Sequence, residues 1–471
     1  MLCAAMLAAL GATVALAPEP SRLPNIVIVF VDDMGWGDLP SQGAEGWEMP
    51  HLARLESEGS RFTHFSVAQP VCSASRCALL TGCWPNRLGI HGALGPWSEI
   101  GLHADETTLA EIAKSRGYAT AAVGKWHLGF QPAFLPTRHG FDEFFGIPYS
   151  NDMWPGHPER PKQWPPLPLI DGEETTERIS ELSRQDPLTR RFTERAVDFI
   201  ERHAEAPFLL YLAHPQPHVP LACHSDWKGT SAQGAYGDVM QEIDWSVGQV
   251  LQALDIADIA DETIVIFSSD NGPWRSYGDH AGGTGGLREG KGTTFEGGLR
   301  VPCLVRWPGV VPAGHVSASE WRSIDLFPTL AAAMQSPLPR DVDGRDMTAL
   351  ITGGAGVESE ASLYYYRTNE LQAVRMGRWK LHLPHGYRSL EGRPGGKGGV
   401  PAKYTYGIPQ NLALYDLQAD PGETTDVKAL HPEVMDRFLA VVEAARADLG
   451  DALTGSEGSG VREPGRVSPA P

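Results

Sequence analysis

The chain has 471 residues, 42% of them hydrophobic, which is enough to bury a large core. Its 58 acidic residues outnumber the 39 basic ones, and the formal net charge of −19 argues against a nucleic-acid partner. No long low-complexity linker interrupts the chain before residue 350. We therefore expect one large domain over residues 22–357, followed by a smaller one over residues 358–450.

Residues 1–17 are apolar, too short to span a bilayer comfortably, and end in A-L-A. This pattern predicts a secretory signal peptide and hence a periplasmic or extracellular protein. No other stretch is apolar enough to cross a membrane, so we expect no membrane association once the signal is removed. An even number of other cysteines would permit disulfides in an oxidising compartment: Cys77, Cys83, Cys223 and Cys303.

The first predicted strand, Asn25 to Val31, is a run of β-branched and aromatic residues, as expected of a strand buried on both faces of a mostly parallel sheet. Asp32 and Asp33 follow it directly. Ligands of open α/β sheets gather at the carboxyl ends of strands, and adjacent carboxylates repel each other unless a cation is present. The pair therefore indicates a hard divalent ion, or else a helix N-cap beside a solvated acid.

A short helix is predicted to begin at Cys72, within the run V-C-S-A-S-R-C-A-L-L-T-G of residues 71–82. Arg76 lies one helical turn further on, so its guanidinium and the thiol share a face. A helix N-terminus and an arginine together favour a tetrahedral oxyanion. The alternative is a buried structural cysteine at the start of an amphipathic helix.

The strand predicted over Tyr118 to Val123 leads to Lys125 and His127, which face the same way if the segment stays extended. A fixed cation and a group that titrates near neutrality would then enter one pocket. A solvated lysine and a packed histidine are the more ordinary interpretation. Further on, a stretch rich in Pro and Trp up to Gly172 predicts a long surface loop.

Two later strands also end in polar groups. The strand Phe208 to Ala213 opens into a proline-flanked loop around His218, which suits either a positioned catalytic side chain or an ordinary rigid turn. The strand Thr263 to Ser268 leads to Asp270 and Asn271. Together with the two aspartates of the first strand, these would form an oxygen-rich cage of the kind that Ca²⁺ or Mg²⁺ prefers.

The last third of the chain changes in character. A glycine-rich stretch over 282–298 carries Lys291, either as one more cation for the anion or as a solvated lysine in a flexible turn. From residue 358, short strand-like runs precede a helix over 432–447, which predicts a small antiparallel sheet packed on that helix. Residues 451–471 are rich in Gly, Ser and Pro and are predicted to be disordered.

Seven motifs follow one another along the chain: V-D-D-M-G-W-G-D at 31–38, the Cys72 motif, G-K-W-H-L-G at 124–129, G-I-P-Y-S-N-D at 146–152, P-H-V-P at 217–220, S-D-N-G at 269–272 and G-K-G-T-T-F-E-G-G at 290–298. In this order they resemble the type I, formylglycine-dependent sulfatases, most of all the arylsulfatase A-like branch. The resemblance implies an alkaline-phosphatase-like α/β/α sandwich with a large, mostly parallel mixed sheet. It also implies a smaller C-terminal α+β domain with a four-stranded antiparallel sheet.

The resemblance further implies the chemistry of the site. A maturation enzyme would oxidise Cys72 to Cα-formylglycine; most members of the family have proline where this chain has Ala74. Ca²⁺, rather than Mg²⁺, would be bound by Asp32, Asp33, Asp270, Asn271 and an oxygen of the modified Cys72. The sulfate pocket would be lined by Arg76, Lys125, His127, Ser150, His218 and Lys291.

In the mechanism that this implies, a hydroxyl of the hydrated aldehyde attacks sulfur, His218 or Lys291 protonates the departing oxygen, and His127 takes the proton of the second hydroxyl. We expect a sulfate monoester of a carbohydrate as the substrate. Candidate outer-pocket residues lie in predicted loops: Trp154, His157, Arg160, Trp164, His385 and Arg388. Two alternatives stay open, a phosphomonoester or phosphonate hydrolase of the same superfamily and a catalytically inactive protein that binds sulfated glycans.

Overall fold

The computed structural model describes residues 22–354 and 361–467. The predicted signal peptide, residues 1–17, lies outside the described residues, and so does the predicted domain boundary at residues 357 and 358. Within the described ranges, no helix combines the length and the apolar content that a membrane crossing would require.

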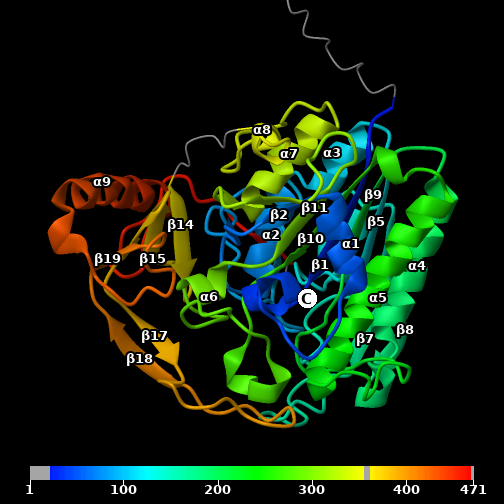
Figure 1. The fold of residues 1–471 in the computed structure, drawn as a ribbon, viewed down its shortest axis with the longest axis horizontal. Coiled ribbons are helices and arrows are strands. Elements are labelled where there is room, and N and C mark those ends of the chain that lie inside the picture. Colours follow the sequence, from blue (N-terminus) through cyan, green and yellow to red (C-terminus); the bar gives the residue numbers. More distant parts are fainter. Residues whose placement is uncertain (1–21, 355–360, 468–471) are drawn as a thin grey trace, which may run out of the picture.

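A ten-stranded mixed sheet forms the centre of the first domain (Figure 1). Its central strands β10, β1, β9, β5 and β6 are parallel, and antiparallel pairs follow on both sides. The predicted large, mostly parallel mixed sheet is thus confirmed. In spatial order the strands are β12 (His315–Ser317), β2 (Ser60–Phe62), β11 (Cys303–Arg306), β10 (Thr263–Ser269), β1 (Asn25–Val31), β9 (Phe208–Ala213), β5 (Ala119–Lys125), β6 (Glu143–Ile147), β7 (Leu167–Asp171) and β8 (Glu174–Ile179).

Helices cover both faces of this sheet (Figure 1). One face carries α1 (Pro50–Glu58), α4 (Leu188–His203) and α5 (Gly234–Ile256), and the other carries α2 (Cys72–Thr81), α3 (Leu109–Ser115) and α7 (Leu326–Ala333). Strand β1 serves both cores because its side chains alternate: Val27 packs on the α4 and α5 side, and Ile28 on the α2 and α7 side. Shorter elements are β3 (Phe65–Ser66), β13 (Trp321–Arg322), α6 (Glu296–Leu299) and α8 (Thr348–Ile351).

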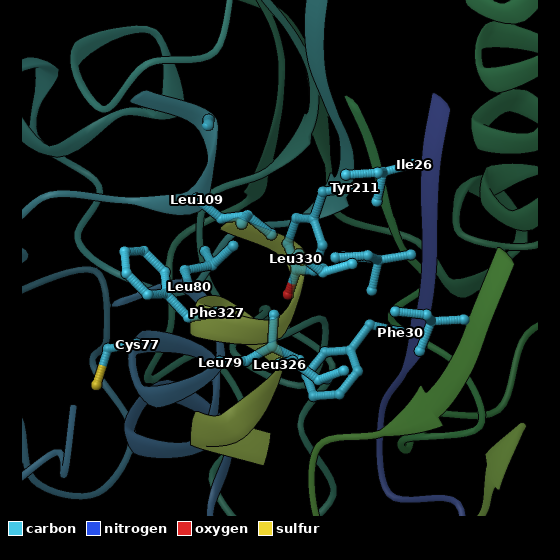
Figure 2. Close-up of a cluster of buried hydrophobic side chains, with 14 of the residues drawn as sticks. Ile26, Phe30, Cys77, Leu79, Leu80, Leu109, Tyr211, Leu326, Phe327 and Leu330 are labelled. Carbon is cyan, nitrogen blue, oxygen red and sulfur yellow. The ribbon is translucent and has the colours of Figure 1, made fainter. Parts of the chain in front are cut away.

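Helix α2 is buried along its whole length. Figure 2 shows its own Leu79 and Leu80 packed among side chains from α7 and β1, namely Leu326, Phe327, Leu330 and Phe30. Gly82 ends the helix in the left-handed conformation (φ 69°), and a Cβ at this position would lie 2.9 Å from the Phe327 side chain. This packing fixes the helix that begins at Cys72.

The second domain is a four-stranded antiparallel sheet packed on α9 (Pro432–Leu449), as predicted (Figure 1). In spatial order its strands are β14 (Ser362–Tyr366), β15 (Glu370–Met376), β16 (Trp379–His382) and β19 (Ala413–Asp416). A separate hairpin, β17 (His385–Ser389) with β18 (Thr405–Gln410), belongs to the same part of the chain. The sequence pattern does not predict this hairpin.

The structure corrects one prediction for the first domain. The stretch up to Gly172 is not a loop throughout, because β7 forms within it: Leu167 and Leu169 alternate into the core, and this apolar pairing outweighs the neighbouring prolines. Before α2 the chain forms two short strands, β2 and β3, with residues 63 and 64 in a turn between them. Four cysteines that could have paired are free thiols: Cys77, Cys83, Cys223 and Cys303.

Residues 451–467 of the tail predicted to be disordered are folded, and residues 468–471 lie outside the described residues. Strand β20 (Gly465–Arg466) pairs with β4 (Ile100–Gly101), and Arg462 Nε donates to Glu106 Oε1 (2.7 Å). These partners are more than 350 positions away in the sequence, so the local Gly and Ser content gives no sign of them.

Leu80→Ala should lower the free energy of unfolding by about 2–5 kcal/mol, because it leaves a cavity in the core between α2, α7 and β1. The matched control is Leu439→Ala: Leu439 lies on α9 and is 42% exposed, so its truncation should change the free energy by no more than about 0.5 kcal/mol. Urea unfolding of both variants measures the difference. Equal destabilisation would contradict the packing described for α2.

Candidate active site

The predicted site residues converge at the carboxyl edge of the parallel strands. Asp32 and Asp33 follow β1, Asp270 follows β10, and Lys125 ends β5, while α2 brings Cys72 to the same edge. All eleven predicted side chains are buried: Asp32, Asp33, Cys72, Arg76, Lys125, His127, Ser150, His218, Asp270, Asn271 and Lys291.

Two adjacent carboxylates form the centre of the site. Asp32 accepts a hydrogen bond from the Cys72 thiol (Sγ to Oδ1, 3.4 Å) and forms an ion pair with Lys125. Asp33 accepts from Lys291 (Nζ to Oδ1, 2.6 Å). Each carboxylate therefore faces its own cation.

The end of β10 is tied to the end of β1. The Asp33 amide donates to Asp270 Oδ1 (3.2 Å), and Asn271 Nδ2 donates to Asp33 Oδ1 (2.6 Å). Arg76 donates to Asp270 Oδ2 from Nε and Nη2 (3.0 and 2.8 Å) and lies 3.8 Å from Asp32. The third nitrogen, Nη1, donates to Lys125 O (3.1 Å), so all three nitrogens have acceptors within the protein, and the expected contact of Arg76 with a sulfate stays a prediction.

The two lysines also touch other groups of the site. Lys125 Nζ donates to Ser150 Oγ (3.2 Å), and Lys291 Nζ lies 3.3 Å from Cys72 Sγ. The ammonium of Lys291 is 4.8 Å from the centroid of the Trp274 ring. Sequence reasoning missed Trp274, because a single tryptophan in a loop belongs to no motif.

Each of the two histidines places one ring nitrogen on a backbone carbonyl. His218 Nδ1 donates to Val219 O (2.6 Å), which leaves Nε2 3.7 Å from Asp33 Oδ2. His127 Nε2 donates to Leu94 O (2.7 Å), which leaves Nδ1 buried and without a partner among the described residues. Because a carbonyl can only accept, the second nitrogen of each ring is the one available for proton transfer.

Burial and neighbouring charges shift the two strand-end carboxyls in opposite directions. Burial alone would raise the pKa of Asp32, but Lys125 and His218 hold that pKa well below its usual range. Burial and the charge on Asp32 raise the pKa of Asp270 to about 7, although Arg76 opposes this shift. The carboxylates thus compete for limited positive charge, and one more cation would allow all of them to ionise.

The thiol and the buried histidine are both neutral in this setting. Burial, with help from Asp270, raises the pKa of the Cys72 thiol well above its ordinary value. A protonated thiol is a weak nucleophile, so the unmodified side chain is poorly suited to attack. Burial and the charge on Lys125 lower the pKa of His127 well below its ordinary value, which keeps it neutral and able to accept a proton.

The donor set fits a hard divalent cation. One donor atom from each of Asp32, Asp33, Cys72 and His218 lies within 4.8 Å of the others. Asp33 Oδ2 and Asn271 Oδ1 are buried and have no hydrogen-bond partner in the described part of the chain. Carboxylate and amide oxygens are the ligands that Ca²⁺ and Mg²⁺ take in proteins. The sequence did not suggest His218 as a member of this group.

The predicted outer-pocket residues occupy different places. Trp154 and His385 are only 7% exposed and lie within the protein. Trp164 stacks on Trp97, with ring centroids 5.0 Å apart. Arg388 reaches the site itself, because its Nη2 donates to the backbone carbonyl of Lys291 (2.6 Å).

Comparison with known proteins identifies the family. The sulfatase family model matches residues 24–336, and the model for the C-terminal region of aryl-sulfatase matches residues 358–457. N-acetylgalactosamine-6-sulfatase from Mus musculus is 38% identical over 445 residues, which cover 89% of this chain and 84% of that protein. Arylsulfatase A from Homo sapiens is 38% identical over 477 residues, which cover 95% of this chain and 92% of that protein.

The fold is shared with solved structures as well. The structure of Ps i-CgsB in complex with k-i-k-neocarrahexaose has a TM-score of 0.75 and 25% sequence identity, over 90% of this chain and 92% of that one. The two family matches and the relatives extend over both domains, so the likeness is not confined to a few motifs. The chain therefore belongs to the sulfatase family, with an alkaline-phosphatase-like fold, and is an enzyme that hydrolyses sulfate esters.

Proposed function

We propose that this sulfatase cleaves sulfate monoesters through a Cα-formylglycine, which a maturation enzyme makes from Cys72. The observation that carries the proposal is the position of Cys72, whose Sγ lies 3.4 Å from Asp32 Oδ1 and 3.3 Å from Lys291 Nζ. The side chain of residue 72 therefore lies between a carboxylate and an ammonium group at the centre of the site. Its own thiol makes little use of that position, because burial keeps it protonated.

The resident ion that we propose is Ca²⁺. It would be held by Asp32, Asp33, Asp270, Asn271 and an oxygen of the modified residue 72. When present, the ion and the formylglycine would supply an activated hydroxyl and a positive charge for the sulfate oxygens. The two unpartnered oxygens, Asp33 Oδ2 and Asn271 Oδ1, support this assignment. Mg²⁺ usually keeps several water ligands, which suits a buried, protein-lined donor set less well.

Lys125, Lys291 and Ser150 would hold the sulfate. Both ammonium groups lie at the central carboxylates, and Ser150 Oγ is 3.2 Å from Lys125. Fixed cations in a buried site stabilise charge that grows on the sulfate oxygens as the ester bond breaks. Arg76 would act through Asp270, whose charge it compensates by two hydrogen bonds.

His218 and His127 would move the protons. His218 donates from Nδ1 to a backbone carbonyl, which leaves Nε2 facing the site, 3.7 Å from Asp33 Oδ2. From there His218, with Lys291 as the other candidate, can protonate the departing oxygen. His127 would take up a proton at Nδ1, since this atom is free and burial keeps the ring neutral.

A sulfated carbohydrate is the substrate class that we propose. One relative is named N-acetylgalactosamine-6-sulfatase, and one similar structure holds a neocarrahexaose. In this chain Trp97 is 59% exposed and lies three residues after Leu94, whose carbonyl binds His127. The Trp97 ring stacks on Trp164, with centroids 5.0 Å apart, and an exposed aromatic face of this kind suits the apolar face of a sugar ring. On the strength of residues 1–17, we also propose a periplasmic or extracellular location.

Cys72→Ala should lower kcat on an aryl sulfate by about 10³-fold or more, because it removes the residue that becomes the nucleophile. Mass spectrometry of the wild-type peptide that contains residue 72 should show the aldehyde in place of the thiol. Cys77→Ser, on the same helix, is the control and should keep the wild-type rate. Retained sulfur in active enzyme would refute the formylglycine, and faster turnover of a matched aryl phosphate would favour the phosphomonoester alternative.

Removal of the ion should lower the melting temperature. EDTA treatment followed by Ca²⁺ at about 100 times its Kd should restore about 2.7 kcal/mol of stability, whereas Mg²⁺ at the same concentration should restore less. In Asp33→Asn this response to Ca²⁺ should largely disappear, since a buried ligand loses its charge. Asp255→Asn, which changes an exposed acid, should respond like the wild type. A melting temperature that neither EDTA nor Ca²⁺ changes would contradict the proposed site.

A further inference from the structure

A guanidinium from the second domain reaches the active site. Arg388 lies on β17, in the hairpin that Figure 1 shows below the four-stranded sheet. Its Nη2 donates to the backbone carbonyl of Lys291 (2.6 Å). A Cβ built on Gly292 would lie 2.4 Å from the same nitrogen, so glycine at this position allows the guanidinium to approach the loop closely.

Within the described ranges Arg388 forms no ion pair with an acidic side chain; burial lowers its pKa, but Tyr366, Tyr404 and Tyr406 raise it above its ordinary value. Its guanidinium lies instead over the ring of Tyr404 (4.6 Å) and near that of Trp274 (6.0 Å). Its Nε is buried and lacks a hydrogen-bond partner among the described residues. Glu289, an acid close by, accepts a hydrogen bond from Ser389.

Two arginines that are more deeply buried than the half-buried Arg388 are paired with acids. Arg300 lies 2.5 Å from Glu296, and Arg322 lies 2.8 Å from Asp325. Because a buried charge is unfavourable without a counter-ion, these pairs are the ordinary arrangement. At Arg388 a carbonyl and aromatic rings take the place of an acid, so the donors that they leave unused are available to an anion from outside the chain.

An anion bound by Arg388 would lie close to the sulfate site that is proposed at Lys291. Trp274 contacts both cations, since its ring centroid is 4.8 Å from Lys291 Nζ and 6.0 Å from Arg388 Cζ. The same ring is 5.5 Å from that of His218. Trp274 Nε1 is a second buried donor without a partner in the described residues. An anion at Arg388 would thus belong to the molecule whose sulfate lies at Lys291.

We propose that Arg388, together with Trp274, binds a second oxyanionic group of the substrate, either another sulfate or a carboxylate. This inference rests on the proposed function and narrows it to sugars with two negative groups close together. Arg388 is then a specificity-determining residue, and its hydrogen bond to Lys291 positions the two anion sites relative to each other.

The test compares three substrates in the purified, matured enzyme: a monosulfated hexosamine, the same sugar with a second sulfate, and a monosulfated disaccharide that contains a uronate. The wild type should prefer at least one dianionic substrate by about tenfold or more in kcat/KM. Arg388→Gln should lower kcat/KM for the preferred dianionic substrate about tenfold more than for the monosulfated sugar, and the difference should lie in KM. Arg388→Lys should keep part of the preference, and added salt should reduce it in the wild type.

The control is Arg393→Gln, which removes an exposed arginine after the same strand and should leave the preference unchanged. The two dianionic substrates distinguish a sulfate from a carboxylate as the second group. A wild type without preference for either would overturn the inference. Equal loss by Arg388→Gln on all three substrates would also overturn it, since Arg388 would then only hold the Lys291 loop. Failure of the wild type to cleave any sulfate ester would contradict the proposed function, and the inference would fall with it.

Discussion

The site depends on opposite charges that meet away from water. Asp32, Asp33 and Asp270 end two adjacent parallel strands, and each carboxylate has a cationic side chain in contact. A buried charge is strongly unfavourable unless it is paired, so the position of each group is dictated by the others. The ion pair between Arg76 and Asp270 ties α2 to these strand ends, because Arg76 lies on the helix that begins at Cys72. The helix that carries Cys72 therefore cannot shift without disturbing the buried ion pair between Arg76 and Asp270.

Apolar packing holds the same helix from the other side. Every residue of α2 is buried, and Leu80 and its neighbours lie against α7 and β1. Strand β1 is apolar from Ile26 to Val31 and becomes acidic at the next residue, where the two cores end. The apolar residues of β1 thus pack in the two cores, and the acidic residues lie at its carboxyl end, where ligand sites of open α/β sheets usually form. Charge on one side and close packing on the other leave α2 little freedom.

Site residues could be predicted from the sequence where they directly follow a predicted strand. Buried strands with acids at their ends could be predicted, because the carboxyl ends of parallel strands meet at one edge. The partner of Arg76 could not: helical spacing places its guanidinium on the face of the thiol but gives no sign of a carboxylate 194 positions away. Trp274 could not be predicted either, since only the fold brings its ring close to Lys291 and His218. The β17–β18 hairpin and the folded tail likewise depend on distant contacts.

The second domain completes the site by immobilising the glycine-rich loop. As an isolated sequence this loop would suit a flexible turn with a solvated lysine, yet Lys291 is only 7% exposed. Arg388 binds the carbonyl of Lys291, Gln372 accepts from Thr294 (3.2 Å), and Lys380 pairs with Glu296 (2.9 Å). Three strands of the C-terminal domain therefore hold three residues of the glycine-rich stretch: Lys291, Thr294 and Glu296. Since glycine-rich backbone loses much conformational entropy when it is ordered, these contacts are what allow Lys291 to act as a fixed cation.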